Sequence, residues 1–217
     1  MSEAWYLAIE SSAPEASLAL TRGAELVFEC SVSAGRRPSE VLMEPLQEAL
    51  AAIPAGERLE AVVLGRGPGS YNGARVGIAA GQGVALVHEC GVAGLCSLEA
   101  VEAVRAGGPC LAVGDARRET FFAVPLVDGA LAGETELLGE NEFQERVEGA
   151  LHDGGTLFSF ERTERLGLPD ALANEILVVT PGARLLMDAW NAKSMEEREQ
   201  LLGAPPQPFY LREPYVT

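Results

Sequence analysis

Apolar and polar positions alternate along the first part of the chain in a way that predicts short strands. Three runs carry this pattern, at residues 5–11, 16–20 and 25–32. Pro14 and Arg22-Gly23 separate the runs, and such residues are typical of tight turns. The pattern therefore predicts a meander of three neighbouring strands.

A helix is predicted to follow the meander. Ser39 is its expected N-cap, and the helix is expected to extend to about Ala52. Pro45 lies inside the pattern and is expected to kink the helix or limit its first turn. The apolar positions that define the helix recur at helical spacing: Leu42, Leu46, Ala49, Leu50 and Ile53.

The rest of the first half predicts a strand, a loop and a helix, followed by a second strand and helix. The apolar run 61–65 is typical of a buried strand, and a glycine-rich loop leads from it into a small-residue helix over 74–89. Residues 92–95 form the next predicted strand, and Ser97 is the expected N-cap of the helix after it.

The second half begins with a pattern similar to that of the first. Residues 111–133 predict strand, turn, strand and turn, as residues 7–26 do. The further predicted elements are a helix at 141–151, strands at 156–160 and 175–179, and a helix at 181–192. The tail from Gly203 to Thr217 contains four prolines and is expected to be extended on the surface.

This order of elements predicts an α/β protein made of two duplicated lobes, as in the actin-like and sugar-kinase-like ATPase fold. The expected lobes are residues 1–106 and 107–217, with the tail a candidate for packing back on the first lobe.

The charge of the chain excludes one class of function. Asp and Glu total 32 against 16 Lys and Arg, a formal net charge of -16. A protein that binds nucleic acid by itself needs a basic surface, because Lys and Arg neutralise the phosphates. Hydrophobic residues make up 47%, as in ordinary globular domains, so the acidity does not indicate a disordered tail.

Other features of the sequence argue against a secreted disulfide-bonded protein, a membrane protein and a zinc protein. The four cysteines form no CxxC pair, and the first residues lack the pattern of a signal peptide, so reduced thiols and a cytoplasmic location are expected. No run approaches 18 apolar residues, which argues against a membrane span. His88 and His152 show no zinc-ligand spacing, and no metal site is expected.

The glycine-rich segment from residue 67 to residue 77 is the most unusual part of the chain. A P-loop is excluded there, because Gly73-Ala74-Arg75 stands where a P-loop has Gly-Lys followed by Ser or Thr. The glycines have two interpretations, namely close helix packing and contact with a ligand such as phosphate. The residues concerned are Gly67, Pro68, Gly69, Ser70, Gly73, Arg75 and Gly77.

Two polar groups are candidate nucleotide or phosphate contacts. Glu10 and Ser11 end the first predicted strand, and Asp115, Arg117 and Arg118 occupy the matching position in the second half. Ordinary polar turns and surface ion pairs explain both groups equally well. Arg36-Arg37 is a similar case. No nucleophile, base and orienting residue can be assembled, and the serine hydrolase motif GxSxG is absent.

Five segments of the chain resemble the TsaB (YeaZ) family, the non-catalytic partner of TsaD in the bacterial synthesis of threonylcarbamoyladenosine on tRNA. The segments are LAIESS at 7–12, GPGSYNGARVGIAAGQGVAL at 67–86, CSLEAV at 96–101, DARRETFF at 115–122 and PFYLREP at 208–214. The sequence departs from the family pattern at Glu10, which replaces Asp, and at Pro38, Asn72 and Thr120, and Pro45 comes one position later than in the family.

The resemblance implies an actin-like duplicated fold and a chain that is not itself an enzyme. It implies TsaD and the P-loop ATPase TsaE as protein partners, a homodimer when alone, and tRNA contact only within the complex. No cofactor is expected, and nucleotide at the partner interface is left open. The helix near Ser39 corresponds to the family segment that packs against partner helices.

The apolar residues of that helix have two interpretations. Ser39, Leu42, Met43, Leu46 and Leu50 are the predicted partner interface, and the alternative is that these leucines pack the chain's own core. A second functional hypothesis is an actin-like-fold ATPase or small-molecule kinase that uses Glu10 and Asp115. A metallopeptidase fits badly, because paired histidines are lacking.

Overall fold

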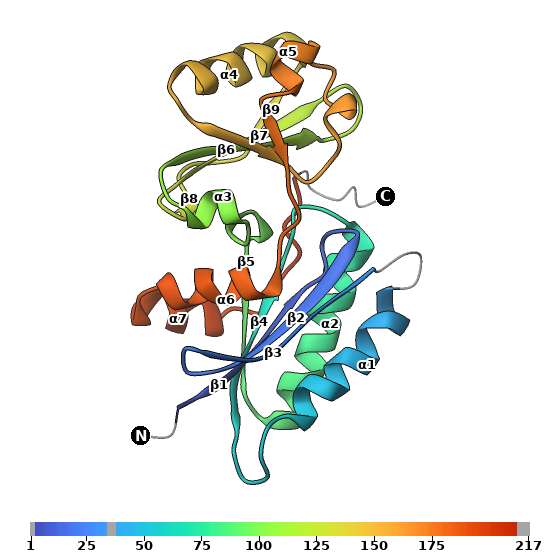
Figure 1. The fold of residues 1–217 in the computed structure, drawn as a ribbon, viewed down its shortest axis with the longest axis vertical. Coiled ribbons are helices and arrows are strands. Elements are labelled where there is room, and N and C mark those ends of the chain that lie inside the picture. The colour runs from blue at the N-terminus through green and yellow to red at the C-terminus, as the bar shows by residue number, and fades with distance from the viewer. Residues whose placement is uncertain (1–2, 34–37, 212–217) are drawn as a thin grey trace. The chain divides into compact units, whose positions relative to one another are not determined.

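The computed structural model describes residues 3–33 and 38–211, and the chain divides into two compact units. The first unit is Met1–Ala100 with Pro181–Phe209, and the second is Val101–Thr180 with Tyr210–Thr217 (Figure 1). The sequence placed a single boundary between residues 106 and 107. The structure differs because the chain returns to the first unit after residue 180.

The first unit is built on one five-stranded sheet with the strand order β3-β2-β1-β4-β5. The predicted meander is confirmed, since the first three strands pair in antiparallel fashion, while β4 and β5 run parallel to β1. The strands are β1 (Trp5–Glu10), β2 (Glu15–Arg22), β3 (Glu25–Ser33), β4 (Leu59–Gly65) and β5 (Gly91–Leu95).

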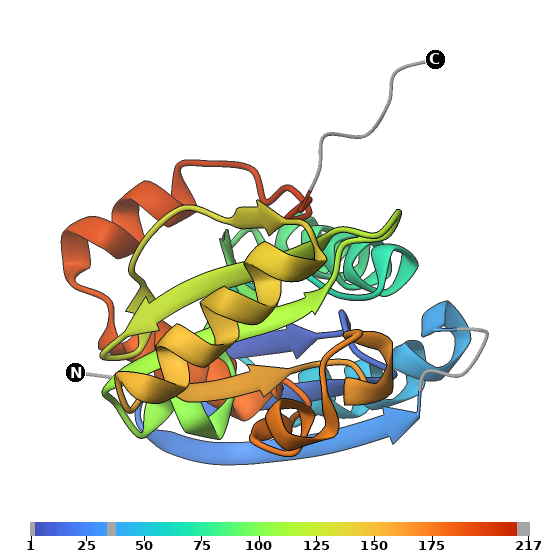
Figure 2. The same ribbon diagram turned by 90° about the horizontal axis from the view of Figure 1, so that it is seen from above.

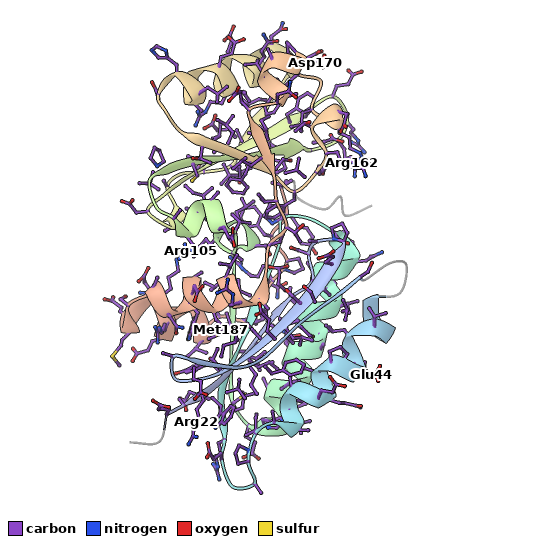
Figure 3. All side chains as sticks on the ribbon, viewed as in Figure 1. Arg22, Glu44, Arg105, Arg162, Asp170 and Met187 are labelled. Carbon is purple, nitrogen blue, oxygen red and sulfur yellow. The ribbon has the colours of Figure 1, made fainter. Side chains whose placement is uncertain are left out.

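Helices pack on both faces of this sheet. Successive side chains of a strand point to opposite faces, so Leu7 and Ile9 pack with α1 (Pro38–Ala51) and α2 (Tyr71–His88). Ala8, between them, packs on the other face with α6 (Ala183–Ala192). The buried side chain of Met187 belongs to that second layer (Figure 3).

The second unit repeats the same topology. Its sheet has the order β11-β10-β6-β7-β8, and β9 also pairs with β7. The strands are β6 (Pro109–Asp115), β7 (Phe121–Val127), β8 (Ala130–Leu131), β9 (Glu136–Leu138), β10 (Thr156–Ser159) and β11 (Ile176–Val178). Like β1, β6 pairs antiparallel to the next strand and parallel to a later one, which confirms the predicted duplication.

One long helix covers a face of the second sheet. It is α4 (Glu140–His152), seen across the strands in Figure 2, and its buried Phe143 stacks on Phe121 with ring centroids 4.6 Å apart. The short helical segments of this unit are α3 (Glu102–Arg105), η2 (Thr163–Arg165) and α5 (Asp170–Ala173).

One predicted helix differs from the structure, and one helix of the structure was not predicted. The helix expected after Ser97 is instead the short turn η1 (Ser97–Glu99) followed by α3. In addition, α7 (Met195–Leu202) was not predicted, although Ser194 and Glu197 form a capping box at its start. The described part of the tail after α7, which ends at residue 211, is exposed only in part, because Pro206 is buried.

Candidate functional site

The candidate site lies where three parallel strands of the first sheet end. The strands β1, β4 and β5 end at Glu10, Gly65 and Leu95, and parallel neighbours end at the same edge of a sheet. Three connecting segments meet there: Ser11-Ser12, the loop 66–70, and Cys96-Ser97.

Glu10 is the central residue of this edge, and its side chain is fully buried. Its Oε1 accepts hydrogen bonds from the backbone N of Ser12 at 2.7 Å and from the Ser12 hydroxyl at 2.6 Å. Its Oε2 has no hydrogen-bond partner among the described residues. The carboxyl group occupies the space where a Cβ of Gly65 would stand, so a larger residue at the end of β4 would displace the Glu10 carboxyl group.

Burial raises the pKa of Glu10. Hydrogen bonds from the side chains of Ser12 and Ser97 and from backbone groups oppose this shift but do not cancel it. The physical cause is that a charged carboxylate loses its hydration in the protein interior.

The glycine-rich loop is held by hydrogen bonds to neighbouring segments of the same unit. The Ser70 amide donates to the Ser12 carbonyl at 2.5 Å, and the Gly67 amide donates to the Ser97 hydroxyl at 2.9 Å. Ser70 is also the N-cap of α2, since its hydroxyl accepts from the Gly73 amide at 3.1 Å. These amides therefore bond within the protein rather than pointing outward to a ligand.

The structure favours packing as the reason for the glycines. A Cβ at Gly69 would lie closer than 3.0 Å to the Ser12 carbonyl oxygen, and one at Gly73 equally close to that of Ser11. A Cβ at Gly77 would meet the Ser11 hydroxyl, and one at Gly81 the side chain of Leu64. The glycine face of α2 thus lets the helix approach the end of β1. Pro68 follows Gly67 through a cis peptide bond.

Arg75 lies apart from this buried network. Its guanidinium carbon is 4.3 Å from the centroid of the Tyr71 ring, and both side chains are exposed at the start of α2. Arg75 therefore stacks on a residue of its own helix.

The predicted interface residues of α1 divide into two groups. Leu42 and Leu46 are 1% and 3% exposed and pack in the core under the helix, and Leu50 packs against the same cluster. Met43 is 48% exposed. The assignment of these leucines to the interface is therefore corrected to the core, because their helical spacing places them on the face toward the sheet.

The first turn of α1 also differs from the prediction. The helix begins at Pro38, a residue well suited to the first helical position, so Ser39 lies inside the helix rather than at its N-cap. Pro45 lies within the helix. Arg36-Arg37 lies outside the described residues.

The matching position in the second unit is a charged turn. Asp115 ends β6, and its carboxylate accepts from the Arg117 backbone N at 2.6 Å and lies 3.2 Å from the Arg117 guanidinium. Arg117 and Arg118 both have positive φ angles, 67° and 57°, within this turn. Burial raises the pKa of the nearby Glu161, an effect that Arg117 opposes.

The turn interpretation therefore accounts for Asp115 and Arg117, which pair with each other. Arg118 is exposed in the same turn. Local sequence patterns do not indicate that Gly65 and Ser97 lie beside Glu10 at the edge of the first sheet. A glycine at the end of a buried strand, Gly65, was the available signal for close approach.

Two further features are absent from the described residues. Within 3–33 and 38–211, no group of three or more His, Cys, Asp or Glu side chains is arranged to hold a metal ion. No helix in these ranges is long and apolar enough to cross a membrane.

The topology of the two sheets defines the class of protein, which is the actin-like and sugar-kinase-like fold. The chain belongs to the TsaD family, described as tRNA N6-adenosine threonylcarbamoyltransferase, whose model matches residues 32–145, more than half of the 217 residues. Together with the structural neighbours below, this match confirms the resemblance to TsaB (YeaZ).

Two solved structures from Pseudomonas aeruginosa share the fold. One, described as an uncharacterized protein with similarity to the peptidase YeaZ, has a TM-score of 0.66 and 23% identity, covering 96% of this chain and 100% of that one. The other, YeaZ, has a TM-score of 0.64 and 22% identity, covering 87% of this chain and 91% of that one.

One curated relative also matches part of the sequence. An uncharacterized protein of Mycobacterium leprae (strain TN) is 44% identical over 73 residues, which is 33% of this chain. The match spans 20% of the length of that relative.

Proposed function

We propose that this chain is a non-catalytic subunit that supports a TsaD-type catalytic subunit in the cytoplasm. The complex would add the threonylcarbamoyl group to the adenosine next to the anticodon of tRNAs that read codons beginning with A. Membership of the TsaD family supports the reaction, and the motifs shared with TsaB support the accessory role. TsaE is proposed as a further partner, and tRNA as a ligand of the complex only.

The observation that carries the accessory role is the closed edge of the first sheet. Enzymes that transfer phosphoryl groups need free backbone amides for the phosphates and a carboxylate that can reach a metal ion. Here the amides of Gly67, Ser70 and Gly73 bond to the protein itself, and Glu10 is fully buried. This arrangement weighs against the alternative of an ATPase or kinase that uses Glu10.

The outer surfaces of α1 and α2 are the proposed docking face. The two helices contact each other and cover the same face of the sheet. Met43 on α1 is exposed, as are Leu86 and Val87 near the end of α2, at 82% and 78%. The neighbouring Glu44 side chain projects from the outer side of α1 (Figure 3). Exposed apolar side chains of this kind are typical of protein interfaces.

Aspartate substitutions test the docking face. Met43→Asp and Leu86→Asp are each expected to weaken binding to purified TsaD by about tenfold or more, because a charge would enter an apolar contact. Met195→Asp is the matched control, since Met195 is 79% exposed on α7, away from these helices. The midpoints of thermal unfolding should stay near that of the parent protein, because all three side chains are exposed.

The same variants test the proposed homodimer of the isolated chain. If α1 and α2 serve both assemblies, Met43→Asp lowers the mass measured by light scattering to that of a monomer. Unchanged TsaD binding by both Met43→Asp and Leu86→Asp would contradict the docking face.

A further inference from the structure

The side chain of Glu10 is an acid in the protein interior without a neutralising partner. It is 0% exposed, and no ion pair to it exists among the described residues. A buried charge of this kind is costly unless it is paired, so the neutral form is favoured.

The carboxyl group is also a structural link. Through Oε1 it holds both the amide and the hydroxyl of Ser12. The Ser12 carbonyl in turn accepts the Ser70 amide at 2.5 Å, and Ser70 caps α2. A continuous path of hydrogen bonds therefore leads from Glu10 to the glycine-rich loop and the first turn of α2.

Burial, and not a neighbouring charge, is the main influence on the protonation state of Glu10. The titratable and charged groups on the adjoining elements are Cys96, Glu99 with Lys193, Arg66 and Arg75. Burial raises the pKa of the Cys96 thiol to about 12, so Cys96 is neutral at ordinary pH. Glu99 lies 2.8 Å from the Lys193 ammonium group. Arg66 follows β4, and Arg75 is exposed on α2.

We propose that Glu10 is a pH-sensitive latch, whose buried carboxyl group holds Ser12, and through it the loop 67–70, against the sheet while it is neutral. Oε1 accepts the two Ser12 bonds in either protonation state, so loss of the proton breaks neither of them. It leaves instead a buried negative charge with an unpartnered oxygen, which gains hydration when the loop opens, so the loop opens more readily. The latch depends only on the first unit and is independent of the proposed function.

A rise in pH is expected to weaken the closed loop, because burial raises the pKa of Glu10. Because the folded pKa lies above the ordinary value of 4.5, the neutral acid stabilises the closed loop fully below that value. This stabilisation is lost progressively as the pH rises from there to the folded pKa, and it stays lost at higher pH.

Hydrogen exchange of the Ser70 and Gly73 amides, corrected for the intrinsic dependence on pH, measures the opening of the loop. In the parent protein, protection should fall by up to about tenfold per pH unit from the ordinary glutamate range up to the folded pKa of Glu10 and then stay constant, since one proton is involved. Glu10→Gln keeps the shape without the charge, so its protection should not change with pH. Glu60→Gln is the control, because Glu60 is exposed on the neighbouring β4.

Carbon-13 NMR of the Glu10 carboxyl group in the parent protein supplies a second measurement that needs no variant. The expected result is a titration above the ordinary glutamate range together with the loss of protection. A Glu10 carboxyl that titrates at or below that range would overturn the latch. Equal dependence on pH in the parent protein and in a folded Glu10→Gln variant would overturn it as well.

Discussion

Two glycines of α2 provide a matched test of the packing argument. Gly73 and Gly83 lie in the same helix, and alanine at either position adds one methyl group. A Cβ at Gly83 would meet nothing within 4 Å. A Cβ at Gly73 would collide with the Ser11 carbonyl oxygen and come within 3.1 Å of the Ser70 hydroxyl oxygen.

The two substitutions are expected to have opposite signs. Alanine is about 1 kcal/mol better than glycine inside a helix, so Gly83→Ala should stabilise by about that amount. At Gly73 the same gain is opposed by about 1–3 kcal/mol of overpacking. The hydrogen bonds of Gly73 with Ser11 and Ser70 are also disturbed, at about 1 kcal/mol each. The net loss for Gly73→Ala is therefore about 2–4 kcal/mol.

The collision at Gly73 cannot be relieved by a side-chain rotation. The atom in the way belongs to the main chain of Ser11, and the next residue, Ser12, is fixed by Glu10 and Ser70. The backbone would have to move, which is why the cost is assigned to the folded state.

Urea unfolding and calorimetry of the two variants and the parent protein measure these differences. A change of 1 kcal/mol corresponds to about 2–4 °C in Tm for a chain of this size. Gly83→Ala should therefore raise Tm by about 2–4 °C, and Gly73→Ala should lower it by roughly 5–15 °C. If Gly73→Ala stabilises the protein as much as Gly83→Ala does, the close approach of α2 to β1 is not real.

Three further predictions concern other parts of the molecule. Ser194→Ala should lower the free energy of unfolding by about 1 kcal/mol in urea titrations, because it removes the cap of α7; no change would argue against the capping box. At pH 8, Cys96 should react with iodoacetamide far more slowly than the partly exposed Cys90, as followed by mass spectrometry, since its thiol has a pKa of about 12; equal rates would contradict its burial. Calorimetry of the isolated chain with ATP and magnesium should show no binding at millimolar nucleotide, and a saturable heat would favour the ATPase alternative.

Much of the fold was predictable because alternation and helical spacing reflect burial directly. Leu7 lies in β1 and Leu111 in β6, the central strands of the two sheets, as the repeated pattern indicated, and the topology repeats around them. The lobe boundary was not predictable in this way. Sequence order does not reveal that α6 returns to the first sheet, where it buries Trp190 and Met187.

The candidate site was harder to predict than the fold. Spacing identified the apolar side of α1 but could not tell the buried Leu42 from the exposed Met43 as a docking residue. Ser97 looked like a helix cap, whereas its hydroxyl accepts a hydrogen bond from Gly67, 30 residues earlier. Such a contact depends on the parallel arrangement of β4 and β5, which a local pattern does not contain.

Reconstituted modification of tRNA tests the central claim most directly. Purified TsaD, a tRNA substrate and threonylcarbamoyl-adenylate would be combined with this chain, and each protein would be assayed alone. The account predicts no threonylcarbamoyladenosine from this chain alone, and a clear increase in product when it is added to TsaD. Product formed by the isolated chain, or no effect of the chain on TsaD, would contradict the account.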